Sequence, residues 1–441
     1  MSAIKKHLSS AQIIILSFIF EILIGSFLLM LPIATKDLKG ASFFDALFTA
    51  TSSTCVTGLI VHDTATYWSG FGQAVIITLI QIGGMGVVTI AVLISTLSGK
   101  NISLKERSTM QEAISAHKVG GIVRLMGFII KSTIVFELVG ALIMFPSFFK
   151  EFGLKGIWYS IFHSISAFCN AGFDLMGVEE KFSSVTYFYN NPFINFTIMS
   201  LIVIGGIGFV TWDDIKTNKI HVKKYSMQSK VILVTTLLLI LFPFIYFFFF
   251  EFSEWSFSDR FWISLFQAVT PRTAGFNTVD LNKLSDTGKA IMIILMLIGG
   301  SPGSTAGGMK TTTIAIMMSA SISVFTRKKH SHFFGRRVGD DTVRNAVAVF
   351  MIYMILCFLS GAIISRVENI SLLTSLFETA SAIGTVGLTL GITTKIGLFS
   401  KSILIILMYI GRVGSLTLIF SALSKLKENS ERLPEEKITV G

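Results

Sequence analysis

The 441-residue chain is 52% hydrophobic and only 14% charged, with a formal net charge of +11 and a mean hydropathy of +0.71. Soluble domains usually carry about 25% charged residues, so this composition excludes a soluble globular protein and indicates several membrane crossings. Forty phenylalanines and seven prolines favour lipid-facing helices over a β-barrel, whose strands would alternate apolar and polar residues.

The first apolar run, residues 13–31, is long enough to span a membrane. It lacks a small-residue cleavage site before the next polar stretch, so we expect it to remain in the protein as a transmembrane helix. It is followed by a short amphipathic stretch at 43–53, a small-residue segment that ends at Gly58, and a second apolar run at 71–97. The first unit is therefore expected to contain a span, a short helix, a loop and a second span.

The same order recurs about every 110 residues, a period too long for a solenoid and fitting a duplicated membrane unit. Further pairs of spans are expected at 125–145 and 191–211, at 231–250 and 289–323, and at 343–364 and 402–423. The sequence thus predicts an all-α membrane protein: four pseudo-symmetric repeats, with eight transmembrane helices and four re-entrant pore helices, around one central pore. We place the repeats at 1–98, 99–213, 214–326 and 327–424, followed by a cytoplasmic C-terminal tail at 425–441.

The short stretch of every unit carries a phenylalanine and then a polar residue, shortly before the glycine. These pairs are Phe48-Thr49, Phe162-His163, Phe266-Gln267 and Phe377-Glu378. At roughly ten to twelve residues, the stretches are too short to cross a membrane and are interpreted as re-entrant helices. An irregular loop at membrane depth is tolerated only where it is buried in protein or lines water.

The segments that end in glycine are the predicted ion-binding residues. They are Thr54-Cys55-Val56-Thr57-Gly58, Cys169-Asn170-Ala171-Gly172, Arg272-Thr273-Ala274-Gly275 and Gly384-Thr385-Val386-Gly387. A dehydrated monovalent cation needs oxygen ligands in place of its water, and backbone carbonyl groups supply them without full charges. Glycine lets successive carbonyls turn toward one axis, and the C-terminal end of a short helix adds roughly half a negative charge. One such segment would equally be an ordinary turn, but four aligned copies favour a selectivity filter.

The second spans share a glycine repeat. It occurs as Ile82-Gly83-Gly84-Met85-Gly86, Ile204-Gly205-Gly206-Ile207-Gly208, Ile298-Gly299-Gly300-Ser301-Pro302 and Ile410-Gly411-Arg412-Val413-Gly414. Small residues that let helices approach closely explain most of these glycines. That interpretation is compatible with a pore, because the inner helices must approach one another below a filter.

The third of these spans is interrupted at its centre. Its small-residue stretch is Gly299-Gly300-Ser301-Pro302-Gly303-Ser304-Thr305-Ala306-Gly307-Gly308, which does not favour a continuous helix. We predict that residues 299–311 form a movable gating loop beneath the filter; a packing kink is the alternative. The stretch also approaches a phosphate-binding loop, but Met309 separates Gly308 from Lys310 and no strand precedes it.

Two cations are assigned to this predicted gate. Arg412 takes the place of Gly300 in the repeat alignment, and a charge at this depth is costly and usually functional. Our hypothesis is that Arg412 donates hydrogen bonds to the loop and holds it shut. Lys310 is expected to mark the cytoplasmic side of the loop and is a second candidate for gating.

Basic residues gather between the units and at the chain end. They include Lys5 and Lys6, Lys105 and Arg107, Lys216 to Lys230, Arg327 to Arg344, and Lys425 to Arg432. The positive-inside rule places these segments and both termini in the cytoplasm. Anionic lipid headgroups or an acidic partner explain the charge better than nucleic acid does.

The remaining reactive residue types form no recognisable catalytic or metal-binding pattern. Cys55, Cys169 and Cys357 lie in apolar or filter-like segments and are expected to be packing groups rather than parts of a disulfide framework. No histidine, cysteine and carboxylate grouping has the spacing of a metal or nucleophilic site. The sequence therefore argues against an enzyme.

The chain resembles the Trk/Ktr/HKT superfamily of potassium transporters, most closely its bacterial KtrB-type membrane subunits. The resemblance covers nearly the whole chain and is most specific at 268–278, 299–311 and 381–388. It implies potassium uptake across the bacterial plasma membrane, a membrane homodimer and a cytosolic nucleotide-binding ring of the KtrA type as regulator. It implies no cofactor for this chain, potassium as substrate and sodium as a candidate activator. Members with serine at the first filter glycine tend to pass sodium, so Gly58 favours potassium.

Arg272 departs from a simple filter, because a cation facing the axis would repel the transported ion. We expect its side chain to point behind the filter, toward loop carbonyls or an acidic neighbour such as Asp280. The main alternative to a channel-like pore is a secondary transporter that couples sodium to potassium or a small solute by alternating access. That mechanism predicts inverted repeats with paired unwound segments, whereas here the repeats share one orientation and the break is unique to the third.

Overall fold

A computed structural model describes residues 9–86, 89, 102–114, 120–414 and 436 of the chain. The first two units contain α1 (Ser10–Leu29), η2 (Pro32–Ala34), α2 (Phe43–Thr54), α3 (Thr64–Tyr67), α4 (Gly70–Met85), α6 (Leu104–Ala113), α7 (Ile122–Phe152), α8 (Lys155–Phe168), η3 (Met176–Val178), η4 (Thr186–Phe188), α9 (Pro192–Gly206) and α10 (Phe209–Asn218). The last two contain η5 (Val222–Lys224), α11 (Met227–Tyr246), the π-helical turn η6 (Phe247–Glu251), α12 (Phe257–Val269), η7 (Leu281–Lys283), α13 (Asp286–Leu297), α14 (Thr311–Phe325), β1 (His332–Phe333), β2 (Arg336–Arg337), α15 (Asp340–Glu368), α16 (Leu372–Ile383) and α17 (Leu398–Val413).

Among the described residues, four helices are long and apolar enough to cross a membrane, and a fifth is added if α9 and α10 are taken as one bent span. The four are α1, α7, α11 with η6, and α15, which are the first helices of the four units. Their outward faces expose large apolar side chains, such as Phe20, Leu142 and Phe242, each about two-thirds accessible. Such faces suit lipid. The second helices are shorter, so the expected count of eight crossings stays a prediction.

The short helices α2, α8, α12 and α16 lie where the re-entrant stretches were expected, and they contain only 12 to 14 residues. Serine residues cap three of them: Ser42, Ser256 and Ser371 accept hydrogen bonds from main-chain N–H groups of the first turn. Each short helix packs against the first helix of its own unit.

The units also pack on one another in a closed order. The second helix of each unit contacts the short helix of the next one: α4 contacts α8, α9 contacts α12, α13 contacts α16, and α17 contacts α2. The fourth unit therefore returns to the first. This cyclic packing brings the C-terminal ends of the four short helices toward the middle of the molecule.

The second helices end earlier than the sequence suggested. Gly86, Gly208 and Gly414 follow α4, α9 and α17 with φ values of 86°, 93° and 90°, a region in which side chains are strongly disfavoured. The span expected at 191–211 therefore ends at Gly206, and α10 leaves at 96° to α9. The further parts expected at 71–97 and 402–423 lie largely outside the described residues.

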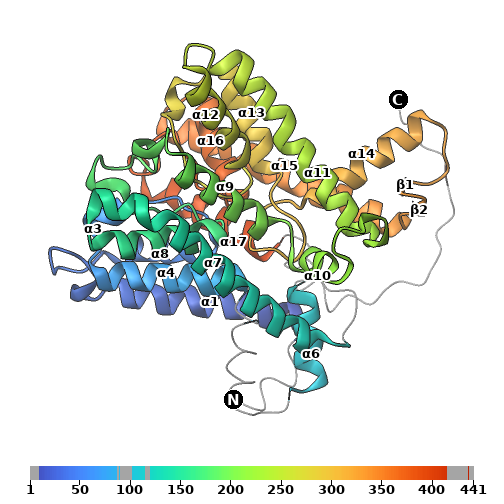
Figure 1. The fold of residues 1–441 in the computed structure, drawn as a ribbon, viewed down its shortest axis with the longest axis horizontal. Helices are drawn as coiled ribbons and strands as arrows, with labels where there is room; N and C mark the ends of the chain where they lie inside the picture. Colours follow the sequence, from blue (N-terminus) through green and yellow to red (C-terminus); the bar gives the residue numbers. More distant parts are fainter. Residues whose placement is uncertain (1–8, 87–88, 90–101, 115–119, 415–435, 437–441) are drawn as a thin grey trace.

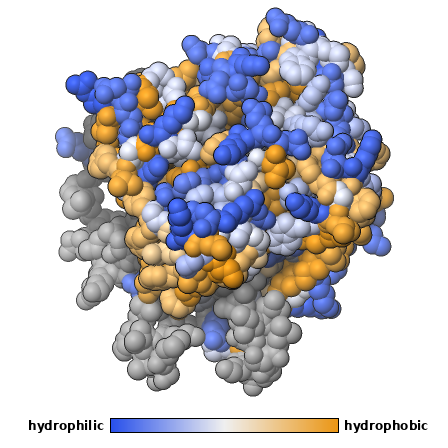
Figure 2. Space-filling model, turned by 90° about the vertical axis from the view of Figure 1, so that its left-hand side faces the viewer, coloured by the Kyte–Doolittle hydropathy of each residue, from blue (hydrophilic) through white to orange (hydrophobic). Residues whose placement is uncertain are grey.

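The third unit carries the longer break, but the expectation that a break is unique to it is wrong, because α9 and α10 of the second unit are already separated by a 96° bend. Its second helix is broken into α13 and α14, and residues 298–310 between them are irregular apart from a bridge between Ile298 and Met309. In Figure 1, α14, α10 and the β1–β2 hairpin lie at the right, and α3 lies at the left. Figure 2 views the molecule from that left-hand side and shows hydrophilic residues across the middle of the face, with apolar residues along its lower and right-hand margins.

Candidate ion pathway

The four glycines that end the predicted filter segments lie together in a ring. Their φ values are 91°, 68°, 80° and 91° for Gly58, Gly172, Gly275 and Gly387. A β-carbon on Gly58 would lie 2.5 Å from the carbonyl oxygen of Ala171, and one on Gly172 would lie 2.6 Å from that of Ala274. On Gly275 and Gly387 it would meet the carbonyl oxygens of Val386 and Thr57, closer still.

Each ring glycine thus faces a carbonyl oxygen of the next filter segment along the chain, and the glycine of the fourth segment faces a carbonyl oxygen of the first. In each case the carbonyl belongs to the residue just before the next glycine. The order closes on itself, so the four segments surround a common axis. A side chain at any of the four positions would press on a neighbouring carbonyl oxygen, so the ring keeps this geometry only with glycine.

A second shared feature is the residue two positions before each glycine. Val56, Asn170, Thr273 and Thr385 have φ values of 56°, 60°, 65° and 51°. A left-handed conformation is uncommon for residues other than glycine and strained for β-branched ones such as valine and threonine. The same unfavourable backbone recurs in four segments of different sequence, which indicates that the surrounding structure imposes it.

The short helices support these segments with hydroxyl groups. Ser52 and Ser381 accept hydrogen bonds from the main-chain N–H groups of Gly58 and Gly387, at 3.1 Å and 3.0 Å. Ser166 donates to the carbonyl oxygen of Phe173, at 2.7 Å. These serines were not singled out in the sequence, although they share a position in the short helices that could have drawn attention to them.

The glycine repeat of the second helices lies directly behind the ring. A β-carbon on Gly83, Gly205 or Gly411 would collide with the carbonyl oxygen of Thr54, Phe168 or Ile383 respectively. Each of these carbonyls ends the short helix of the same unit. Close packing is therefore the role of these glycines, as the sequence indicated, and it holds the inner helices against the filter segments.

The irregular stretch at 298–310, here called the intramembrane loop, lies against the C-terminal ends of α9 in the second unit and α17 in the fourth. Main-chain N–H groups of Ser301 and Thr305 donate to the carbonyl oxygens of Gly206 and Gly205, at 2.9 Å and 3.2 Å. Gly308 donates in the same way to Gly411, at 3.1 Å. The loop thus satisfies terminal carbonyl groups of α9 and α17, which would otherwise lack partners.

Arg412 joins this loop to the inner helices. Its Nη1 donates to the carbonyl oxygen of Thr305, and its Nη2 donates to those of Gly83 and Gly84, the last at 2.9 Å. The guanidinium group therefore binds main-chain oxygens from the first unit and from the loop. Lys310 Nζ donates within the loop to the carbonyl oxygen of Ala306, at 2.9 Å.

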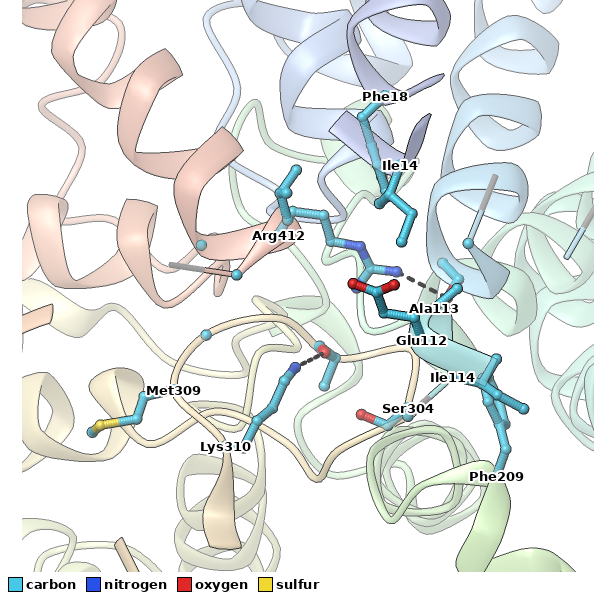
Figure 3. A pocket seen from close by; sticks show the side chains of 18 of the residues that line it. Ile14, Phe18, Glu112, Ala113, Ile114, Phe209, Ser304, Met309, Lys310 and Arg412 are labelled. Carbon is cyan, nitrogen blue, oxygen red and sulfur yellow. Dashed lines mark hydrogen bonds between the residues drawn. The ribbon is translucent and has the colours of Figure 1, made fainter. Parts of the chain in front are cut away.

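A cavity of about 320 Å³ lies on one side of the loop. Figure 3 shows Arg412 and Lys310 pointing toward its middle, while Met309 points away. Residues of α1, α6 and α10 complete the wall, including Phe18, Glu112 and Phe209.

A second cavity, of about 820 Å³, lies beyond the ring on its other side. Ile60, Asn277 and Thr389 line it, each two residues after a ring glycine. Its wall carries four carboxylates and three lysines: Glu180, Glu251, Glu254 and Asp280, with Lys181, Lys283 and Lys395. The ring and the loop therefore lie between two hollows, each lined by charged residues of both signs.

Arg272 does not face the axis. Its side chain is 4% exposed, and Nη1 donates to the carbonyl oxygen of Thr236 in α11, at 3.3 Å. Asp280 instead accepts a hydrogen bond from the main-chain N–H of Asn282, and no ion pair between described residues joins it to Arg272. The expected direction of Arg272 agrees with the structure, and the suggested pairing with Asp280 is wrong.

The three cysteines are buried and free, as expected for packing groups. Cys169 lies against Gly84, where a β-carbon would be 2.7 Å from its sulfur. One further carboxylate close to the ring was missed in the sequence. Asp174 follows the second filter segment, accepts a hydrogen bond from the N–H of Met176, and has its pKa raised to about 7 by burial, with Asp63 adding to the rise.

The fold and the closed ring of segments define a membrane protein for ion transport, and comparisons with known proteins specify the family. The family described as "TrkH: Cation transport protein" matches residues 6–432. The chain belongs to this family of cation transport proteins.

Three relatives illustrate the similarity. The potassium/sodium uptake protein NtpJ of Enterococcus hirae is 40% identical over 99% of this chain and 98% of its own length. The Ktr system potassium uptake protein B of Bacillus subtilis is 39% identical over 98% of this chain and 96% of its own. The crystal structure of the potassium transporter TrkH from Vibrio parahaemolyticus has the same fold, with a TM-score of 0.74, 20% identity, and coverage of 93% of this chain and 84% of that one.

Proposed function

We propose that this chain takes up potassium across the bacterial plasma membrane through a channel-like pore whose filter is the ring of carbonyl groups. The observation that carries this proposal is the closed order of contacts between each ring glycine and the carbonyl oxygen of the next segment. Such a ring offers main-chain oxygens from four directions to a dehydrated alkali ion. The names of the relatives, which specify potassium uptake, support the choice of ion.

The intramembrane loop is proposed as the gate, with Arg412 as its holder. Its position between the ring and the 320 Å³ cavity is that of an obstruction on the path. Its links are main-chain hydrogen bonds, each worth about 0.5–1.5 kcal/mol net, so a modest change in the surroundings would release it. The ion then passes from the 820 Å³ cavity through the filter and past the loop to the cytoplasm.

The regulatory part of the proposal concerns partners. The chain acts as a membrane homodimer whose cytoplasmic side binds a nucleotide-binding ring of the KtrA type, with sodium as a candidate activator. Both termini lie in the cytoplasm, since the basic segments between the units are there by the positive-inside rule. The hairpin β1–β2 and α10 carry such basic residues, including Arg336, Arg337 and Lys216.

Growth of a bacterium that lacks its own potassium uptake systems, at low external potassium, tests this function. Expression of the chain restores growth under the proposal, and purified protein in liposomes carries potassium down its gradient without moving sodium in fixed proportion. Gly58→Ser is expected to let sodium pass. Uptake that requires sodium in fixed proportion would instead favour an alternating-access transporter.

A further inference from the structure

The side chain of Thr305 in the intramembrane loop contacts the second filter segment. This contact is separate from the main-chain hydrogen bonds and the Arg412 contacts of the proposed gate. The hydroxyl of Thr305 lies 3.0 Å from the carbonyl oxygen of Phe168 and 3.2 Å from Asn170 Oδ1, and shares its one proton between these two acceptors. Phe168 and Asn170 flank the start of the second filter segment. All three residues are fully buried or nearly so.

Asn170 extends this contact to the third filter segment. Its Nδ2 donates to the carbonyl oxygen of Arg272, at 3.0 Å, and lies 3.3 Å from the hydroxyl of Thr273. One amide therefore joins the loop, through its oxygen, to the neighbouring segment, through its nitrogen. Asparagine suits the position because it tolerates the φ of 60° observed there better than most residues do.

The third segment depends on such support. Thr273 is itself left-handed, with φ 65°, and this conformation persists only where neighbours fix it. The carbonyl of Ala274, one residue further on, belongs to the ring. The Asn170 amide binds the carbonyl of Arg272, which lies only two residues before Ala274. A shift of this amide is therefore expected to move the ring carbonyl of Ala274.

Arg412 holds the same loop residue by its main chain, since Nη1 donates to the carbonyl oxygen of Thr305. The anchor of the loop and the link to the filter thus meet at one residue. Movement of Thr305 breaks the contact with Arg412 and the contact with Asn170 together.

Among the described residues, the equivalent positions of the other segments provide no such link. Val56 has no polar group to offer. The side chain of Thr385 lies beside Gly307 of the loop, but its hydroxyl is buried without a hydrogen-bond partner. Thr273 interacts with Asn170 and not with the loop. The second segment is therefore the one that couples loop and ring.

We propose that Asn170 is a positioning residue for ion selectivity, which transmits the position of Thr305 in the loop to the carbonyl groups of the third filter segment. The inference rests on the proposed function, because it assumes that the ring selects ions and that the loop moves. Its consequence is that the two are energetically coupled. A pore whose loop has been released then discriminates less well between potassium and sodium than a pore with the link intact.

The test measures the potassium-to-sodium permeability ratio of the full-length protein in liposomes of bacterial lipid. Thr305→Val removes the hydroxyl at nearly constant volume, and Thr305→Ser keeps it as the conservative control. Asn170→Gly removes the amide while retaining a residue that accepts positive φ. Val56→Gly, at the same backbone position of the first segment, measures what a freer filter backbone does by itself.

Thr305→Val is expected to lower the permeability ratio about three- to tenfold, the effect of losing one buried hydrogen bond, and Thr305→Ser should restore it. Adding Thr305→Val to Asn170→Gly should have a smaller effect than Thr305→Val alone, whereas it should add fully to Val56→Gly. A change in flux alone, without a change in the ratio, is what a purely structural contact would produce.

An unaltered ratio in Thr305→Val, or full additivity with Asn170→Gly, would overturn the inference. Should Asn170→Gly fail to reach the membrane, the Thr305→Val and Thr305→Ser pair decides alone. Absence of potassium flux through the parental protein in the same liposomes would instead contradict the proposed function.

Discussion

The first and third units use the same glycine repeat for different purposes. In the first unit, α4 runs to Met85, and Gly83 packs directly on the carbonyl of Thr54 behind the ring. In the third unit, α13 ends at Leu297, and Gly299 packs instead on the carbonyl of Gly307 within the intramembrane loop. One small-residue pattern thus packs either against the end of a short helix or against an irregular loop, depending on the residues that follow it.

The ring is the part in which all four units behave alike, so damage there should have the largest effect. Gly387→Ala would place a β-carbon against the carbonyl oxygen of Thr57 in a backbone with φ 91°. We expect potassium flux in liposomes to fall at least about tenfold, since strain and collision act together. Gly391→Ala is the matched control: its φ is 84°, but no atom lies within 4 Å of the added carbon. Equal losses in both variants would show that strain and not the ring contact is responsible.

In the third unit, a substitution that frees the intramembrane loop should raise potassium flux instead of lowering it. Arg412→Ala removes the hydrogen bonds to Thr305, Gly83 and Gly84, and we expect basal potassium flux to rise several-fold because the loop is held less tightly. Arg344→Ala, which removes an exposed arginine paired with Asp341, serves as the control and should leave flux unaltered. Unchanged flux in Arg412→Ala, at normal expression, would remove the argument for a gate.

The packing behind the ring can be tested with two neighbouring glycines of α9. Gly205→Ala brings a β-carbon onto the carbonyl of Phe168, whereas on Gly206 the nearest atom would be 3.7 Å away. Overpacking of this kind costs about 1–3 kcal/mol, so the melting temperature in detergent should fall clearly in Gly205→Ala and little in Gly206→Ala. Similar melting temperatures for the two variants would contradict the close packing behind the ring.

The smallest effect on potassium uptake is expected from protonation of Asp174, which follows the second filter segment. The pKa of Asp174 is raised to about 7 by burial, so this carboxyl is charged above that pH and neutral below it. Loss of a negative charge near the pore weakens the attraction for cations, so potassium uptake should decline modestly as external pH falls through about 7. Asp174→Asn should remove this dependence and show low uptake at every pH.

Asp37→Asn provides the comparison for that experiment. The hydrogen bond from Thr35 lowers the pKa of Asp37, which therefore stays charged over the whole range tested. A pH profile that is altered as much by Asp37→Asn as by Asp174→Asn would show that local charge at the surface, and not Asp174, controls uptake.

Part of this architecture could be read from the sequence because it depends on local patterns. The amphipathic stretch at 43–53 predicted a short helix, and α2 occupies Phe43–Thr54. The alignment of Arg412 with Gly300 predicted its contact with the loop, which the hydrogen bond to Thr305 provides.

Other parts depend on contacts that leave no mark in the sequence. Arg272 binds a main-chain carbonyl of Thr236, an acceptor that every residue carries, so the choice of Asp280 was wrong. The left-handed conformation of Val56 is imposed by the surrounding ring against the preference of a β-branched residue. The chain turns from α9 into α10 at Gly208. The sequence around Gly208 follows the same glycine repeat as that around Gly86, so the sequence alone does not predict the 96° angle between the two helices.

The most direct measurement is an experimental structure of the protein in rubidium or thallium, with the ion located by its anomalous signal. We expect a peak on the common axis, surrounded by the carbonyl oxygens of Thr57, Ala171, Ala274 and Val386. A structure in which the ring holds no ion at saturating rubidium, or in which the ion lies away from these four carbonyl groups, would contradict it.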